Sequence, residues 1–534
     1  MTSLLAFAYL APRLQLVLPE MLLFVGAVLV AVRGLSRSRA TRSALPGIAC
    51  ATLVASGIAA WFVWTPEAAS SSGLLFPMLG RFVKPAIALV AAVLVLLSVG
   101  SVDRLVEDAV ARGRRAFDAQ RVIRGEFYAF LLFSVMGTML LCNASDLIWL
   151  FLAIELVSLP TYIMVAIGGH GTRPQEAAVK YFFLGALSTA VFLYGFALIY
   201  GATGSLELVA IRDALALQAA SGGISTIAMI GLGMAVLGLC FKITAVPMHF
   251  YAPDVYEGAP THVAAFLAFV PKAAGFLALA LILACVGWTG HSFLDADGVR
   301  VGYSGLPTPI AAILWMVAAV TMTLGNVGGL LQGSVKRTLA YSSIAHSGYM
   351  VIGLVAGPSA GIDALLFYLL AYGVMTTASF AALCALERKG EELNAFADLS
   401  GMRAKHPVMA WMLALSQASL VGLPPFIGFV AKVYLFIAAF EAGQVGLVVI
   451  AVLNSAVSAL YYLRIAMMPM VAPPSARSQE VTLVPSAWPR VAAVVCGVAT
   501  LVMSAFASQI LAAVRDATPA NPPRLASHDA SKQP

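Results

Sequence analysis

Long apolar segments follow one another along almost the whole chain, separated by shorter polar loops. Runs of about 18 or more apolar residues recur, and each can cross a hydrocarbon core of roughly 30 Å as a helix. The pattern therefore predicts a series of membrane-spanning helices. We expect fourteen spans, at approximately residues 16–33, 46–64, 83–100, 125–143, 146–167, 177–200, 223–243, 260–288, 308–330, 338–356, 362–385, 407–440, 445–463 and 489–513.

Helix-breaking residues interrupt two of these spans, at 240–260 (CFKITAVPMHFYAPDVYEGAP) and 422–436 (GLPPFIGFVAKVYLF). Proline removes a backbone donor and clashes with the preceding turn, and glycine relaxes the backbone, so both segments are predicted to be broken helices. They occupy the fourth place in two successive five-span blocks. Because five is odd, the second block enters the membrane inverted. Paired breaks in inverted halves indicate an ion site near the bilayer midplane.

The predicted fold is thus an all-α polytopic membrane protein with two inverted five-helix repeats. Its expected units are three N-terminal helices with basic loops (1–124), the first repeat (125–290), the second repeat (291–470), a C-terminal helix (471–515) and a polar, proline-rich disordered tail (516–534).

Composition agrees with this interpretation, since 61% of residues are apolar and only 11% are charged, against about 25% in a soluble domain. The net charge of +7 raises the question of nucleic-acid binding, but the basic residues fall in alternate loops. By the positive-inside rule, loops 34–45, 101–124 and 386–406 are predicted to be cytoplasmic and both termini periplasmic. We expect no nucleic-acid partner.

Cofactor motifs are missing from the sequence. The six cysteines lie in or beside apolar runs, without CxxC pairs or metal-type spacing. There is also no GxGxxG after a strand pattern and no GxxxxGK[ST]. The sequence predicts neither a metal site nor a cofactor in this chain, so any redox or ATP chemistry must belong to another subunit.

Four ionisable residues interrupt the apolar spans: Glu155, Lys242, Lys272 and Lys432. Charges at bilayer depth are costly and are usually functional. Glu155 lies nine residues into its span, roughly 13 Å deep at 1.5 Å per residue. Lys242, just before the first break, is its expected partner. Lys272 lies inside the eighth span, and Lys432 follows the second break.

Lysine suits a proton relay better than arginine, because a desolvated ammonium releases its proton far more readily than a guanidinium. The sequence therefore favours a relay through Glu155, Lys242, Lys272 and Lys432, with water-lined half-channels at 244–258 and 422–428. The alternative is that the lysines only join helices or reach the interface.

Other polar residues occupy the edges of spans. Lys84, Lys180 and Lys336 are expected to reach the membrane surface with their ammonium groups, and Glu20 to reach water.

His346, in AYSSIAHSGYM, either extends a hydrogen-bonded wire with nearby serines or is a packing histidine. For His249, Asp254 and Glu257 in the first break we expect a membrane-surface role.

Three motifs in order, KITAVPMHFYAPDVYEGAP, AYSSIAHSGYM and GLPPFIGFVAK, resemble the antiporter-like subunits of respiratory complex I and of the related multisubunit cation/proton antiporters. The YEGAP ending and KYFFLGALSTAVFLYG (180–195) are similar to the N-type subunits of bacterial NADH:quinone oxidoreductase. The resemblance covers roughly 125–470.

The resemblance implies specific roles. Glu155 matches the family's fifth-helix glutamate, and Lys242 the seventh-helix lysine that pairs with it. Lys272 matches the eighth-helix relay lysine, Lys432 the twelfth-helix lysine near the exit, and Lys180 a sixth-helix lysine of the same network.

The implied function is that of a proton-translocating subunit in the membrane arm of NADH:quinone oxidoreductase, in a bacterial inner membrane. NAD, FMN, iron-sulfur clusters and quinone would then be held by partner subunits, which include neighbouring antiporter-like subunits. The alternatives are a subunit of a Na⁺/H⁺ antiporter, a related membrane-bound hydrogenase or dehydrogenase, and a passive membrane scaffold.

Overall fold

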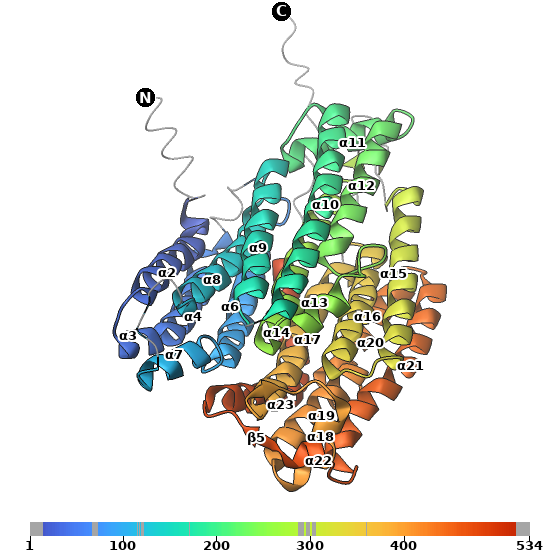
Figure 1. Cartoon of the computed structure of the whole chain (residues 1–534). Coiled ribbons are helices and arrows are strands. Elements are labelled where there is room, and N and C mark those ends of the chain that lie inside the picture. The colour runs from blue at the N-terminus through green and yellow to red at the C-terminus, as the bar shows by residue number, and fades with distance from the viewer. Residues whose placement is uncertain are drawn as a thin grey trace, which may run out of the picture.

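The computed structural model is a bundle of long helices (Figure 1). It describes residues 14–66, 73–114, 116, 118, 122–169, 171–286, 293–294, 300–301, 306–358 and 360–518. Apolar residues cover most of each long helix, as expected for segments whose backbone hydrogen bonds must close internally in lipid.

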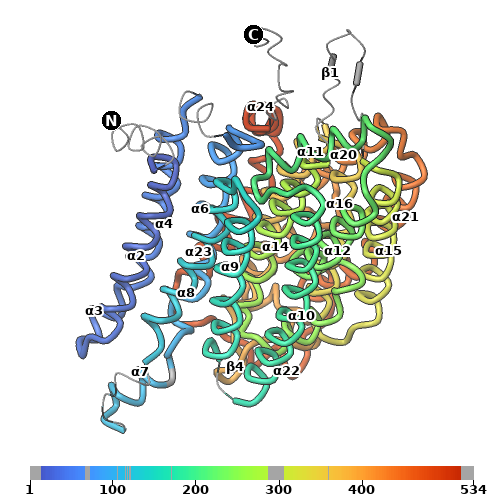
Figure 2. Tube along the Cα trace, turned by 90° about the horizontal axis from the view of Figure 1, so that it is seen from above, coloured from blue at the N-terminus to red at the C-terminus, as the bar shows by residue number. Residues whose placement is uncertain are grey.

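The N-terminal unit lies along one edge of the bundle (Figure 2). Here α2 packs against α4 and α8, and α4 packs against α6. Proline near the start of α2 and of α4 suits the first helical turn, where no backbone donor is required. The helices of this unit are α2 (Leu18–Gly34), α3 (Arg39–Ser43), α4 (Leu45–Val63), α6 (Leu79–Ser98) and α7 (Arg104–Ala111).

The segment predicted to form the first repeat contains the first interrupted helix, between α12 and α13. Two of its helices begin with a side-chain cap. Asp146 accepts a hydrogen bond from Trp149 N at the start of α9, and Ser225 accepts one from Ala228 N at the start of α12. Its elements are α8 (Arg124–Leu140), η2 (Leu141–Asn143), α9 (Leu147–Ile167), α10 (Thr172–Thr203), α11 (Leu208–Ala220), α12 (Thr226–Lys242), α13 (Ala252–Gly258) and α14 (Thr261–Ala284). The two-residue strands β1 (Phe293–Leu294) and β2 (Arg300–Val301) pair antiparallel after α14.

The segment predicted to form the second repeat contains the second interrupted helix, in which α19 ends at Val421 and α20 begins at Ile427. Its elements are α15 (Thr308–Leu330), α16 (Val335–Ala356), α17 (Ala360–Cys384), β3 (Leu386–Arg388), β4 (Glu391–Glu392), α18 (Phe396–Leu399), η3 (Met402–Ala404), α19 (Pro407–Val421), α20 (Ile427–Glu441) and α21 (Val445–Met470).

The C-terminal unit consists of α22 (Ala476–Gln479), β5 (Val481–Leu483), α23 (Trp488–Ala505) and α24 (Ala507–Ala517). Strand β5 joins β3 and β4 in an antiparallel sheet of order β4-β3-β5, with Leu386 opposite Leu483. In Figure 2, α3, α7 and β4 lie at the end of the bundle opposite α11. The basic loops therefore share one end of the molecule.

The core centres on α14 and α17. All 24 residues of α14 are buried, and α17 packs against α14, α16, α19, α20 and α23. These two helices are enclosed by the others, so a polar side chain on either must find its partner inside the protein.

The predicted all-α membrane architecture with two broken helices is confirmed, and each predicted span coincides with a helix or a pair of helices. Within the described residues, eleven helices are long and apolar enough to cross a membrane by themselves, so the count of fourteen stays a prediction. The expected last span, 489–513, is two helices that meet at Phe506. Short strands outside the spans were not predicted. The expected disordered tail lies beyond the described residues from 519 onward.

Candidate functional site

The first break places Lys242 at the end of a helix. Helix α12 ends there, and Thr244 takes a left-handed conformation, with a φ of 57°, before α13 begins at Ala252. Inside the break, Tyr251 donates to the Phe241 carbonyl at 2.9 Å, and Val246 N donates to Thr321 Oγ1 at 3.0 Å. Side chains thus satisfy part of the backbone that the interrupted helix leaves free.

Glu155 and Lys242 form the expected pair, in which Lys242 is buried and Glu155 is partly exposed. Lys242 Nζ lies 3.5 Å from Glu155 Oε1 and donates to Ser158 Oγ at 2.7 Å. The carboxylate also accepts from Thr189 Oγ1 at 2.9 Å. The shortest contact of the ammonium is therefore to a neutral hydroxyl, and the ion pair is longer than an ideal charge-assisted hydrogen bond.

Lys272 is fully buried in the middle of α14. Its Nζ donates to the Ser343 carbonyl at 2.5 Å and to Ser343 Oγ at 2.7 Å, and it lies 4.7 Å from the centre of the Tyr372 ring. Its contacts in the described structure are to neutral groups. Burying an ammonium without a counter-ion is costly, so within the described residues these hydrogen bonds are what compensates Lys272.

Lys432 has a similar environment beside the second break. Its Nζ donates to the Val421 carbonyl at 2.7 Å, which is the last carbonyl of α19, and to Ser455 Oγ at 2.9 Å. Gly422 takes a left-handed φ of 89°, and a Cβ there would lie only 3.0 Å from Lys432 Cδ. The glycine therefore permits both the break and the passage of the lysine.

Hydroxyl groups of α16 connect the first break to Lys272. Ser347 donates to the carbonyl of Ile243, which follows Lys242, and also to the Ser343 carbonyl at 3.1 Å. Thr244 Oγ1 lies 3.2 Å from Ser347 Oγ. Because Ser343 also accepts from Lys272, one turn of α16 links the first two lysine sites.

His346, also on α16, continues this polar region toward α17 and α21. Its Nδ1 lies 2.8 Å from Tyr368 Oη and its Nε2 2.8 Å from Tyr462 Oη. Tyr462 also hydrogen-bonds Ser342. Both ring nitrogens thus have hydroxyl partners, so the histidine belongs to a hydrogen-bonded cluster, an arrangement open to both the wire and the packing interpretation.

The sequence analysis assigned no chemistry to the tyrosines, yet several face the lysines. Tyr372 donates to Ser343 Oγ at 3.0 Å, and the Tyr349 ring centre lies 5.0 Å from Lys432 Nζ. Tyr368 and Tyr372 are four residues apart and share one face of α17. That spacing within an apolar span was the signal that could have identified them.

Lys180 lies apart from the buried pair. It is about nine residues along α10 from Thr189, or roughly 13 Å at 1.5 Å per residue. Its Nζ pairs with Glu176 at 2.9 Å and with Asp254 at 3.0 Å. Asp254 and Glu257 also pair with Arg337, at 2.8 and 3.0 Å. These charges line a cavity of about 280 Å³, so Lys180 belongs to the rim of the first break.

Two expectations about span edges were wrong. Lys84 and Glu20 do not reach water: both are buried, with Nζ and Oε1 2.6 Å apart. Lys84 also donates to the Leu16 carbonyl at 2.8 Å and to Asn143 Oδ1 at 3.2 Å. Folding brings α2, α6 and η2 together, which supplies partners that a single span does not show.

Lys336 likewise finds protein partners. It is buried and donates to the Ala259 carbonyl at 2.8 Å and to Glu392 Oε2 at 3.0 Å. Glu392 reaches the end of the bundle from strand β4 and also accepts from Thr261. The ammonium is thus held by a loop carboxylate, which removes the need to reach the membrane surface.

The site is suited to proton transfer between oxygen and nitrogen atoms. In the described part of the chain, no group of three or more His, Cys, Asp or Glu residues is arranged to hold a metal ion. The groups available for such transfer are the Glu155–Lys242 pair, two lysines with neutral partners, and the hydroxyl groups and imidazole close to them.

Comparison with known proteins gives one family. The family described as NADH:quinone oxidoreductase/Mrp antiporter, TM, matches residues 144–296 and 303–458. NADH-quinone oxidoreductase subunit N of Trichlorobacter lovleyi is 36% identical over 454 residues, covering 85% of this chain and 86% of the relative.

Solved structures agree with that match. A chain of respiratory complex I from Thermus thermophilus aligns over 93% of this chain and 99% of its own, with a TM-score of 0.71 and 29% identity. A chain of the Mrp complex from a Dietzia species aligns over 95% and 97%, with a TM-score of 0.73 and 22% identity. The second likeness concerns the fold alone.

Proposed function

This chain belongs to the NADH:quinone oxidoreductase and Mrp antiporter family of membrane subunits, and we propose that it is the N-type, proton-translocating subunit in the membrane arm of an NADH:quinone oxidoreductase. The relatives that match most of the chain carry the name of that subunit. A polytopic helical bundle with buried ionisable residues is what such a role requires.

The observation that carries the proposal is the unequal environment of the three lysines. Lys242 faces the carboxylate of Glu155, whereas the partners of Lys272 and Lys432 in the described structure are neutral oxygens and aromatic rings. A proton on Lys242 is therefore stabilised by a charge, and a proton on either of the other two is not. In the proposed relay, Lys242 is therefore the position that holds the proton, and Lys272 and Lys432 are the positions that pass it on.

The mechanism follows from the Glu155–Lys242 pair as a two-state element. When the pair is close, the carboxylate holds the proton on Lys242. When the two side chains separate, that attraction falls and the proton is passed to Lys272, and from there past His346 to Lys432. A ligand or neighbour can shift such an equilibrium only through its differential interaction with the two states.

The breaks would supply the water that these transfers need. Unwound backbone at membrane depth is tolerated where it lines protein or a hydrated cavity. We place half-channels at 244–258 and 422–428, with the cavity beside Lys180, Asp254 and Arg337 at the mouth of the first. Lys180 would act there, at the rim of the relay.

Redox chemistry is assigned to partner subunits. NAD, FMN, iron-sulfur clusters and quinone would bind there, and this chain would bind none of them. Its partners would be other membrane-arm subunits, including neighbouring antiporter-like subunits, and the lipid bilayer. We place the protein in a bacterial inner membrane, as a translocase subunit with both termini on the periplasmic side, from the distribution of its basic loops.

A cation/proton antiporter subunit is the second candidate, because the family that matches this chain is described as including Mrp antiporters as well as NADH:quinone oxidoreductase. It would use the same lysines without a redox partner. The N-subunit relatives favour the first candidate, since their identity extends across 85% of the chain.

Purification of the tagged chain in mild detergent separates the two. We expect flavin- and quinone-binding subunits to purify with it, and NADH to drive proton uptake in inverted vesicles at a rate that does not depend on Na⁺. Recovery without redox subunits, together with Na⁺-dependent proton movement in the absence of NADH, would replace the proposal with the antiporter.

A further inference from the structure

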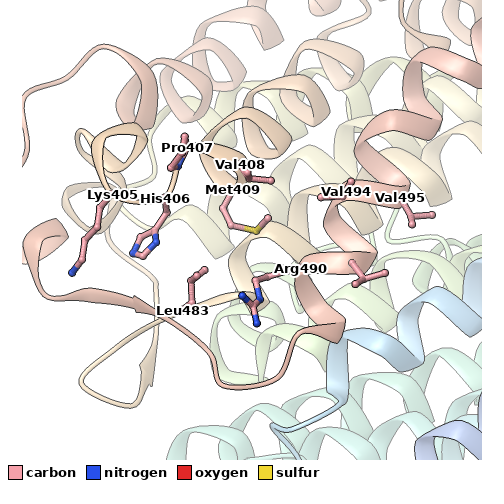
Figure 3. A pocket seen from close by; sticks show the side chains of 10 residues that line it. Lys405, His406, Pro407, Val408, Met409, Leu483, Arg490, Val494 and Val495 are labelled. Atoms are coloured by element: carbon pink, nitrogen blue, oxygen red, sulfur yellow. The ribbon is translucent and has the colours of Figure 1, made fainter.

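A groove of about 440 Å³ lies between the start of α19 and the start of α23, away from the relay. Figure 3 shows Lys405 and His406 at one end, Leu483 and Arg490 beside them toward the middle, and Val494 and Val495 farther along α23. The groove is thus basic at one end and apolar along its length.

The basic end is held in place by backbone contacts. Lys405 Nζ donates to the carbonyls of Gln479 and Val481, at 3.0 and 2.8 Å. His406 Nε2 lies 3.1 Å from the Val481 carbonyl. These contacts fix the positions of the two side chains at the groove mouth, and both partners are neutral carbonyl groups.

Arg490 brings a second uncompensated charge to the same place. In the described structure its guanidinium has no ion pair, and its Nε is buried without a hydrogen-bond partner. The nearby carboxylates are already engaged, since Asp398 pairs with Arg477 at 2.7 Å and Glu480 with Lys389 at 2.8 Å. A half-buried guanidinium without a counter-ion favours binding of an anion.

The position of the groove selects the kind of anion. Trp488 at the start of α23 is 52% exposed, as is typical of an aromatic residue at the membrane–water interface. Loop 386–406, which provides Lys405 and His406, is predicted to be cytoplasmic. The valines continue from this level along two apolar helices, so the groove begins at headgroup depth and extends toward the hydrocarbon.

We propose that this groove binds an anionic phospholipid of the cytoplasmic leaflet. Its phosphate would lie between Lys405 and Arg490, and one acyl chain would follow Val408, Val491 and Val494. Basic pockets between membrane helices on the cytoplasmic side are general binding sites for such headgroups. The charges and the apolar wall are independent features, and a phospholipid is the ligand that satisfies both.

Photolabelling of the purified complex tests this site. The probe is phosphatidylglycerol with a diazirine in its acyl chain, compared with phosphatidylethanolamine carrying the same group. We expect phosphatidylglycerol to label the peptides containing Val408 and Val494 in preference to the zwitterionic probe. Arg490→Gln should lower labelling about fivefold, the factor that corresponds to about 1 kcal/mol for one basic residue near an anionic lipid.

Two further variants keep the test independent of folding. Arg403→Gln removes one positive charge from the same loop, on an exposed residue outside the groove, and should leave labelling unchanged. Val494→Trp fills the apolar wall and keeps both basic groups, and should abolish labelling. Equal labelling by the two lipids, or an unchanged Arg490→Gln variant, would overturn the proposal. So would a cross-link from this groove to a neighbouring subunit in place of lipid.

Discussion

Replacing Glu155 by glutamine tests the role of the negative charge in the proposed two-state Glu155–Lys242 pair. The glutamine amide is nearly the same size as the carboxylate and keeps an oxygen to accept from Thr189, which now donates at 2.9 Å. What disappears is the negative charge 3.5 Å from Lys242 Nζ. Any functional loss therefore reports on electrostatics and not on packing.

The size of the effect follows from that distance. Two unit charges 3.5 Å apart interact by about 5 kcal/mol at an effective dielectric constant of about 20. Since about 1.4 kcal/mol changes an equilibrium tenfold, removing the carboxylate would shift the balance between the close and separated states of the pair by a factor of up to about 10³. Water that reaches Glu155, which is 18% exposed, reduces this, so we expect proton pumping to fall at least about tenfold.

The assay is NADH-driven acidification of inverted membrane vesicles, measured together with NADH:quinone reductase activity. With tight coupling, both rates should fall in Glu155→Gln and in Lys242→Met. Thr189→Val is the matched control, because it removes one hydrogen bond to the carboxylate, a contribution of about 1.5–3 kcal/mol, and retains both charges. Its pumping defect should be smaller.

Two results would refute the reasoning. Pumping at the wild-type rate in Glu155→Gln or Lys242→Met would remove the pair from the mechanism. A Thr189→Val defect as large as that of Glu155→Gln would show that local packing, not charge, is responsible. Normal assembly with lost pumping would in turn exclude the passive scaffold.

Three further outcomes are expected. Ser343→Ala should lower pumping severalfold without preventing assembly. Lys272 would lose its hydroxyl partner at 2.7 Å but keep the backbone carbonyl at 2.5 Å. An unchanged pumping rate would place that hydroxyl outside the relay. Lys84→Met should lower the thermal stability of the purified complex, since breaking a buried ion pair costs about 3–5 kcal/mol. The double variant that also carries Glu20→Gln should recover much of the lost stability. Equal stability of the single and double variants would contradict the pairing. Burial alone would raise the pKa of Asp398, but the hydrogen bonds from Arg477 and the backbone amides lower it below 3.8. The stabilisation by Asp398 is then complete above pH 3.8 and is lost as the pH falls through the lowered pKa, so cleavage of loop 386–406 by pepsin should increase in that acidic window in the wild type. Asp398→Asn should be cleaved at every pH tested, and a wild-type profile in that variant would contradict the assignment.

The sequence by itself determined the membrane architecture. A run of apolar residues long enough to cross the bilayer has few alternatives to a helix, because its backbone groups must pair within the segment. For the same reason the proline and glycine residues at 240–260 and 422–436 located both breaks: helix α12 ends at Lys242 and α19 at Val421. The cost of burying a charge singled out Glu155, Lys242, Lys272 and Lys432 as candidates without any contact being known.

The tertiary structure decided which polar groups meet. Lys84 and Lys336 lie near the ends of their helices, where sequence gives no reason to prefer a protein partner over water, yet both are buried against carboxylates from distant segments. The tyrosines around Lys272 and His346 likewise come from separate helices, α17 and α21. The periodicity of a single helix shows which face is polar but not what that face contacts. Those contacts depend on how helices that are equally apolar pack together, which the packing of small residues and a few interhelical hydrogen bonds determines.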